Sequence, residues 1–132
     1  MSKIMLSQEY NRREFSPPMP VLDIGVSKPG ADVPSRIIEA IIDTGADGTL
    51  LPRDILKHAG APYIDRVHLV SITGERRPVD LYVVTLYLGE RRVHGVQTVA
   101  LPAGATAILG RDVLNQLRLH LDGLAGVTEV MA

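Results

Sequence analysis

The chain has 132 residues, with 14 Lys and Arg against 15 Asp and Glu, four His, no Cys and no Trp. A chain of this length folds as one domain around an ordinary hydrophobic core, and it is too short for two large lobes with a cleft between them. The net charge of −1 gives no electrostatic basis for binding nucleic acid or an anionic membrane surface, and the lack of Cys excludes disulfides, thiolate nucleophiles and thiolate-ligated metals.

The first residues differ in composition from the rest of the chain. Residues 1 to about 20 are polar, contain Ser16-Pro17-Pro18 and show no apolar periodicity. We therefore predict a flexible N-terminal tail over 1–20, followed by a domain over 21–132. The only early apolar run, Ile4-Met5-Leu6, is too short for a signal peptide, and no segment approaches the length of a membrane span. We expect a cytoplasmic protein that does not bind membranes, with a bacterium as the default source.

From residue 21 onward, short runs of β-branched and aliphatic residues alternate with Gly, Pro and Asp. This pattern indicates a mostly β domain, either a barrel or a sandwich. The expected strands lie in VLDIGVS, RIIEAIID, RVHLVSI, VDLYVVTLYLG, RRVHGVQTVALP and ATAIL. Two segments have helical character instead: Arg53 to Ala59, which follows Pro52 and ends at Gly60, and Asp112 to Leu119. Because both helices are short, sheets must form the core.

The end of the chain, RLHLDGLAGVTEV, alternates apolar and polar residues on both sides of a Gly-containing turn. This alternation predicts a terminal β-hairpin. Such a hairpin leaves an unpaired strand edge, which is an aggregation hazard unless something covers it. A second copy of the same chain would cover the edge well.

One segment combines a strand with a reactive side chain. The apolar run Ala40-Ile41-Ile42 leads directly into Asp43-Thr44-Gly45. This order places a carboxylate at a strand end where the chain turns sharply, with Thr44 able to hydrogen-bond to nearby backbone and Gly45 permitting a close backbone approach. The arrangement fits one half of a pair of catalytic aspartates. An Asp-Gly turn without catalytic function gives the same tripeptide, so this motif alone leaves both interpretations open.

A second segment repeats this plan 67 positions after Asp43, where the apolar strand Ala107-Ile108-Leu109 ends at Gly110. With both motifs in this order, residues 21 to about 125 resemble the retropepsin-like aspartic proteases, which are single-domain relatives of the retroviral proteases. The stretch Asp43 to Asp47 looks like the catalytic loop of that family, and Ile108 to Asp112 looks like its second hallmark. The resemblance implies a closed acid-protease β-barrel with one short C-terminal helix, assembled as a homodimer.

The resemblance also implies roles for the first loop. Asp43 would be the catalytic aspartate, with Gly45 in the same catalytic triplet. Thr44 would form cross-subunit hydrogen bonds that join the two active-site loops of a dimer. Ala46, the next residue of the loop, would contribute to substrate binding.

Further matched residues connect the two motifs. Asp47, which would also contribute to substrate binding, is expected to form a buried or half-buried ion pair with Arg111 near the base of the dimer. A solvated surface pair of little energetic value is the alternative. Thr49 would hydrogen-bond toward the helix at Asp112, and Gly110 would belong to the same structural and dimer-supporting group.

Between the motifs, residues 68–79 are typical of a β-hairpin with its tip near Thr73-Gly74. In the retropepsin-like family such a hairpin is the flap that closes over substrate. The resemblance therefore assigns Ile72, Thr73 and Gly74 to substrate binding, with the flap backbone holding an extended peptide as an added strand. The tip contains one Gly, unlike the Gly-rich tip of the retroviral members, and a plain surface turn is the alternative.

The chain contains a single Asp-Thr-Gly, and this number bears on whether it acts as a monomer or a dimer. An aspartyl pair works when two carboxylates lie so close that one keeps its proton while the other activates water. Neither Asp23 nor Asp122 has the order apolar-Asp-(Thr/Ser)-Gly, so this chain encodes one half of the pair. We expect Asp43 of a second subunit to supply the other half across a two-fold axis, and an isolated monomer to be inactive.

Other chemistries find no support in the sequence. The four His are scattered without a third ligand, and neither a serine-nucleophile motif nor a phosphate-binding loop is present. We therefore predict no metal and no cofactor, and a homodimeric aspartic endopeptidase that cleaves extended, largely apolar peptide segments of its substrates. Two alternatives stay open: a non-catalytic retropepsin-fold module for peptide binding or dimerisation, and a small β-barrel with an incidental Asp-Thr-Gly turn.

Overall fold

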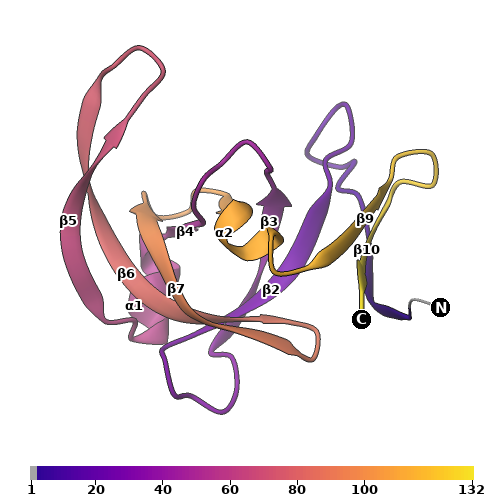
Figure 1. The fold of residues 1–132 in the computed structure, drawn as a ribbon, viewed down its shortest axis with the longest axis horizontal. Coiled ribbons are helices and arrows are strands. Elements are labelled where there is room, and N and C mark those ends of the chain that lie inside the picture. Colours follow the sequence, from indigo (N-terminus) through magenta and orange to yellow (C-terminus); the bar gives the residue numbers. More distant parts are fainter. Residues whose placement is uncertain (1–2) are drawn as a thin grey trace.

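A computed structural model describes residues 3–132. Strands dominate the fold and two short helices accompany them (Figure 1). In chain order the elements are β1 (Ile4–Glu9), β2 (Val21–Ser27), β3 (Arg36–Ile42), β4 (Leu50–Pro52), α1 (Arg53–Ala59), β5 (Tyr63–Val70), β6 (Arg76–Leu88), β7 (Arg91–Leu101), β8 (Ala107–Leu109), α2 (Arg111–Leu114), β9 (Arg118–Asp122) and β10 (Val127–Met131).

Six strands close into a barrel in the order β2-β3-β8-β4-β7-β6. The ring closes because β2 pairs with β3 along one edge and with the far half of β6 along the other, where Gly25 lies opposite Tyr87. A Cβ on Gly25 would lie 2.8 Å from the Cβ of Pro34 and 3.0 Å from that of Tyr87, so the closure point accepts no side chain. The predicted closed, mostly β barrel is confirmed, and the sandwich is excluded.

The barrel interior is the hydrophobic core. Alternate residues of each strand point inward, and on β2 and β6 the buried positions run nearly without interruption where the two strands meet. Fully buried side chains include Leu22, Ile24, Leu51, Leu86 and Leu109. The core supports the strand ends that carry the two motifs.

Helix α1 has the bounds that the sequence predicts. It follows Pro52 and ends at Gly60, whose φ of 68° lets its N–H reach the carbonyls of Leu56 and Lys57. The second helix is shorter than predicted, because α2 ends at Leu114 and β9 begins at Arg118. From Arg118 onward the backbone N–H and C=O groups form hydrogen bonds in the β9–β10 ladder and not in a longer helix. No helix among residues 3–132 is long and apolar enough to cross a membrane.

The N-terminal segment differs from the predicted flexible tail. Residues 4–9 form β1, which pairs antiparallel with β10 in a three-stranded sheet ordered β1-β10-β9. Gln8 and Asp23 then exchange two hydrogen bonds, of 2.6 and 3.1 Å, that attach β1 to the barrel. The terminal hairpin is confirmed, but its β10 edge is covered by the chain's own N-terminus. The sequence could not reveal this pairing because the partner strands lie at opposite ends of the chain.

Candidate active site

Two parallel strands bring the two sequence motifs together. β3 and β8 pair in register, with Ile42 opposite Leu109, so the residues that follow each strand emerge at the same edge of the barrel. The backbone N–H of Asp43 donates to the carbonyl oxygen of Leu109 at 3.1 Å, which continues the ladder one residue beyond β3. Asp43 is half-buried and Thr44 is exposed. The carboxylate therefore sits at the barrel rim, where a substrate can reach it.

The loop after β3 holds this carboxylate in one orientation. The N–H of Gly45 donates to Oδ1 of Asp43 at 2.9 Å, and the N–H of Ala46 donates to the Asp43 carbonyl at 3.2 Å. A Cβ on Gly45 would lie 3.1 Å from that same Oδ1, so glycine is the residue that fits this turn best. Within residues 3–132, Oδ2 of Asp43 makes no hydrogen bond. One oxygen is thus fixed by the backbone and the other is free to act.

Arg111, at the start of α2, binds the loop over residues 43–49 through its backbone and its side chain. Its backbone N–H donates to the carbonyl of Ala46 at 2.9 Å, and its Nη1 donates to the carbonyl of Thr44 at 2.7 Å. Its Nη2 forms an ion pair with Asp47, as the resemblance implies. This pair lies at the surface of the single chain, because the Asp47 side chain is 93% exposed, and its burial near the base of a dimer stays a prediction. The pair mainly orients the two side chains, because exposed ion pairs add little to the free energy of unfolding.

A buried hydroxyl lies at the centre of the connection between the motifs. Thr49 is 1% exposed; its Oγ1 donates to Oδ1 of Asp112 at 2.8 Å and accepts the N–H of Gly110 at 3.2 Å. Its backbone N–H reaches Oδ2 of the same carboxylate at 3.2 Å. The loop also packs directly on the second motif, because a Cβ on Gly110 would lie 2.4 Å from the carbonyl carbon and oxygen of Gly48. The predicted contact between Thr49 and Asp112 is confirmed.

The predicted hairpin is formed by β5 and β6, with Val70 opposite Arg76 next to the tip. The N–H of Gly74 donates to the carbonyl of Ser71 at 2.9 Å, and Gly74 has a φ of 84°. Residues 71–74 therefore form a β-turn that ends in a residue with left-handed backbone conformation, as is common in hairpin loops. Ile72 at the tip is fully exposed, and within residues 3–132 no hydrogen bond joins the tip to the Asp43 loop. The structure therefore groups the first-loop and second-motif residues, while residues 72–74 stand apart.

Comparison with models of known protein families shows which family the chain belongs to. Residues 31–113 match the family model described as aspartyl protease, and this range covers more than half of the chain and includes both motifs. The chain belongs to the aspartyl protease family. No curated protein matches its sequence.

Two solved structures show which fold this aspartyl protease family member has. A retropepsin-like aspartic protease from Rickettsia conorii superposes with a TM-score of 0.64 at 14% identity, over 99% of this chain and 93% of that chain. The EIAV protease, solved in complex with the inhibitor HBY-793, superposes with a TM-score of 0.54 at 19% identity, over 83% of this chain and 93% of that chain. The fold is therefore retropepsin-like.

The Thr49 hydroxyl is expected to matter for the stability of this family member. Thr49→Val keeps the side-chain shape but leaves the N–H of Gly110 without its acceptor and removes the hydroxyl donor from Oδ1 of Asp112. We expect a loss of about 2 kcal/mol in the free energy of unfolding, measured by chemical denaturation. Thr49→Ser retains the hydroxyl and should lose less than about 1 kcal/mol. A larger loss in Thr49→Ser than in Thr49→Val would show that the methyl group, and not the hydrogen bonds, supplies the stability.

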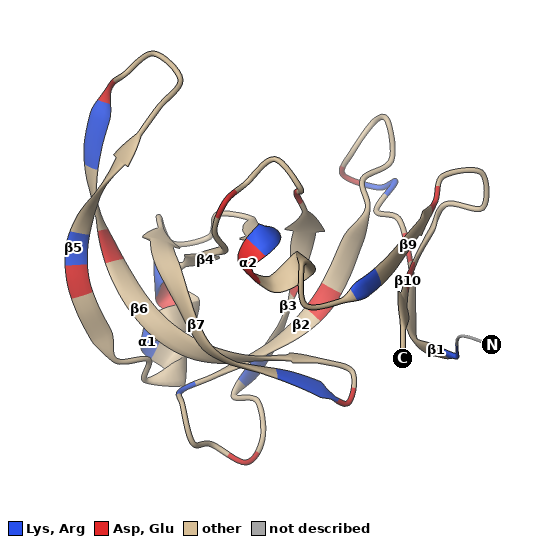
Figure 2. Cartoon of the chain, in the orientation of Figure 1, with Lys and Arg blue, Asp and Glu red and all other residues tan. Residues whose placement is uncertain are grey.

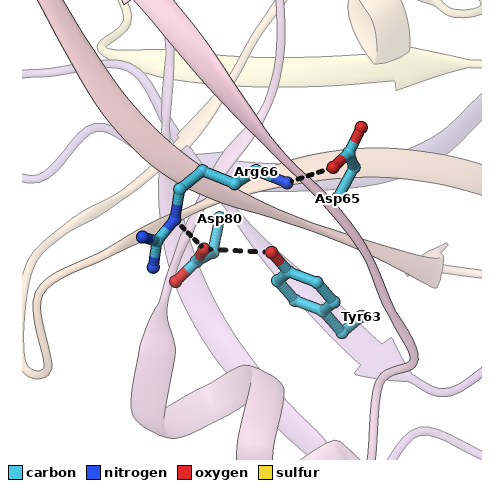
Figure 3. A network of polar contacts seen from close by, with 4 residues as sticks. All are labelled: Tyr63, Asp65, Arg66 and Asp80. Carbon is cyan, nitrogen blue, oxygen red and sulfur yellow. Dashed lines mark hydrogen bonds and ion pairs between the residues drawn. The ribbon is translucent and has the colours of Figure 1, made fainter.

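A polar network at the base of the hairpin was not found by sequence reasoning (Figure 3). Arg66 of β5 and Asp80 of β6 face each other across the strands, with Nε 3.2 Å from Oδ1, and the Tyr63 hydroxyl approaches the same carboxylate oxygen at 3.4 Å. The Tyr63 ring also packs edge-on against Tyr82, with centroids 5.5 Å apart. The hydrogen bond and charge of Asp80 raise the pKa of Arg66. Only the cross-strand register, which the hairpin turn sets, could have revealed this network.

The same network predicts an alkaline titration. Desolvation against its neighbours, with the negative charge of Asp80 second, raises the pKa of Tyr63. Because the folded-state value exceeds the unfolded one, Tyr63 contributes stability below the pKa of free tyrosine and loses it as the pH rises through the folded value. Asp80→Asn should lower the pKa of Tyr63, measured by absorbance at 295 nm as a difference from a Tyr63→Phe variant. An unchanged titration in Asp80→Asn would contradict the role of that charge.

Proposed function

We propose that this chain is an aspartic endopeptidase that acts as a homodimer, with each subunit supplying Asp43 to one shared site. The observation that carries the proposal is the Asp43 carboxylate itself. It stands at the joined ends of β3 and β8, half-buried, with Oδ1 held by the N–H of Gly45. Membership of the aspartyl protease family supports the same chemistry.

The neighbouring carboxylates favour a dimer as the source of the second aspartate. Asp47 is paired with Arg111, and both oxygens of Asp112 accept hydrogen bonds from Thr49. Neither carboxylate is therefore free to join Asp43 in activating water. A second copy related by a two-fold axis between the loops supplies a carboxylate with an identical environment.

Two Asp43 carboxylates brought together this way share one proton, because like charges at close range do not both ionise. The ionised carboxylate takes a proton from a water molecule, and the water oxygen attacks the carbonyl carbon of the peptide bond. The protonated carboxylate gives its proton to the carbonyl oxygen, which forms a tetrahedral diol. Collapse of this diol breaks the C–N bond, and the leaving nitrogen receives a proton from the dyad.

Residues around the dyad take the remaining roles in the proposal. Thr44, whose carbonyl is held by Arg111, faces the partner loop and joins the two loops. Ala46 and Asp47 line the substrate path beside the dyad. Ile72, Thr73 and Gly74 form the tip of a flap that holds an extended peptide through its backbone, and the exposure of the tip in the single chain is consistent with that role.

Digestion of an unstructured peptide library, followed by mass spectrometry, tests this function. We expect cleavage within extended segments, with a specific activity that rises with protein concentration as the dimer forms. Analytical ultracentrifugation on the same samples reports the dimer fraction. Peptide binding by a proven dimer without any product would favour a non-catalytic module, and full activity of a proven monomer would contradict the shared site.

A further inference from the structure

A groove of about 280 Å³ lies between the β5–β6 hairpin and the carboxyl end of β7. Its walls combine apolar side chains with two arginines. The apolar part includes Leu69 and Val79 from the hairpin and Leu101 from β7, and the arginines are Arg53 and Arg77. An apolar channel with cationic groups suits a side chain that has an aliphatic stem and an anionic end.

The fold brings the two arginines in from different elements. Arg77 lies opposite Leu69 in the hairpin, and it shares a strand face with Val79 because side chains alternate along β6. Arg53 begins α1 directly after β4, whose last residue pairs with Leu101 of β7. One guanidinium therefore comes from the hairpin and the other from the barrel. Both residues line the same groove.

The charges in the groove are not balanced by the protein. Among residues 3–132, neither Arg53 nor Arg77 forms an ion pair. The one carboxylate that lines the groove, Asp80, is already paired with Arg66 at 3.2 Å. Figure 2 shows the start of β6 in blue, with a red residue just before it in the hairpin turn. Two exposed guanidiniums without partners favour an anionic ligand.

The groove lies on the side of the barrel where the proposed chemistry takes place. Val99, which lines the groove, donates its N–H to the carbonyl of Thr49 at 3.3 Å, and Figure 1 shows the hairpin tip and the loop between β3 and β4 above the carboxyl end of β7. No residue of the loop over 43–49 lines the groove. A peptide that passes Asp43 and continues under the hairpin would therefore place a side chain here some residues away from the scissile bond.

We propose that this groove is a specificity subsite for an acidic side chain of the peptide substrate, which Arg77 and Arg53 bind together. This inference rests on the proposed function. The two-fold axis of the dimer creates two such grooves, one toward each end of an extended peptide. Preferred substrates therefore carry Glu or Asp on both sides of the scissile bond, outside the central residues.

The test compares matched peptides. A peptide that the wild-type dimer cleaves is resynthesised with Glu or Gln at each position outward from the scissile bond. We expect Glu to raise kcat/KM by about five- to tenfold at one position on each side, mainly through KM, and the gain should shrink as ionic strength rises. Arg77→Gln should bring the ratio of Glu to Gln close to one, and Arg53→Gln should lower it. Arg77→Glu should reverse the preference toward Lys.

Arg76→Gln is the matched control, because Arg76 precedes Arg77 on the same strand, points to the other face and does not line the groove. It removes the same charge and should keep the wild-type ratio. Equal cleavage of the Glu and Gln peptides by wild type would overturn the subsite and leave the proposed function standing.

If the wild-type dimer cleaves no peptide, the proposed function fails and the subsite is tested by binding instead. Fluorescence anisotropy then measures the binding to the dimer of one extended, largely apolar peptide, synthesised either with Glu or with Gln toward both of its ends. Tighter binding of the Glu peptide that is lost in Arg77→Gln supports the subsite. Equal binding of the two peptides, or no binding of either, overturns it.

Discussion

We expect Asp43→Asn to abolish peptide hydrolysis, with kcat lowered by about a thousandfold or more, because an amide can neither take a proton from water nor hold the shared one. The fold should survive, since the Asn carbonyl oxygen can still accept the 2.9 Å hydrogen bond from the Gly45 N–H. Cleavage of a fluorogenic peptide measures the loss, and circular dichroism with ultracentrifugation verifies folding and dimer formation.

Asp23→Asn is the matched control for this variant. Asp23 lies on β2, is exposed and bonds to Gln8, an interaction that an amide side chain can keep. Its activity should equal that of wild type. Retention of hydrolysis in Asp43→Asn, or equal losses in both variants, would contradict the role of Asp43.

Mixing the variant with wild type tests whether the site is shared. If each dimer needs two Asp43 carboxylates, heterodimers are inactive, and an excess of Asp43→Asn should depress wild-type activity in proportion to the heterodimer fraction. Activity that depends on the wild-type concentration alone would show that one subunit suffices.

Gly110→Ala should destabilise the protein by about 3 kcal/mol and abolish activity, because its Cβ would lie 2.4 Å from the backbone of Gly48. Backbone atoms cannot rotate away as a side chain can, so the loop that carries Asp43 must move off the second motif. The hydrogen bonds of Arg111 to the carbonyls of Thr44 and Ala46 would lengthen with it. Chemical denaturation and peptide cleavage measure the two effects.

Gly48→Ala is the matched control, because Gly48 is the other residue of this contact. A Cβ on Gly48 would have no heavy atom within 4 Å, and its φ lies outside the left-handed region. Gly48→Ala should therefore change the free energy of unfolding by no more than about 0.5 kcal/mol and leave activity near wild type. Similar stability losses in the two variants would show that the close approach of Gly110 to Gly48 does not cause the destabilisation by Gly110→Ala.

Local patterns predicted the elements that depend on local interactions. Helix α1 follows from Pro52 before it and Gly60 after it, and the β5–β6 hairpin follows from its turn residues. Two differences from the expected elements remain. β1 forms because β10, at the other end of the described chain, offers it an edge, and no local periodicity could reveal that pairing. α2 ends at Leu114 because residues from Arg118 onward pair in the β9–β10 hairpin, so the apolar positions up to residue 119 do not all belong to a helix.

The candidate site divides in the same way. Residues 43–47 and 108–112 each carry a recognisable motif, and their meeting through parallel pairing of β3 and β8 agrees with the resemblance. For the Asp47–Arg111 pair the sequence left burial and exposure open, and the 2.4 Å approach at Gly110 was not predictable, because both depend on how the loop packs. The same holds for the groove with Arg53 and Arg77, which are 24 positions apart in the sequence.

The sequence by itself determined a single mostly β domain with one Asp-Thr-Gly, since length, strand patterning and motif order are properties of the chain alone. The tertiary structure decided which groups stand together: Thr49 under Gly110, Arg66 against Asp80, and two unpaired arginines beside one groove. The physical reason is that hydrogen bonds and charges act over a few ångströms of space, whatever the number of residues between them. Closure of the barrel sets those distances.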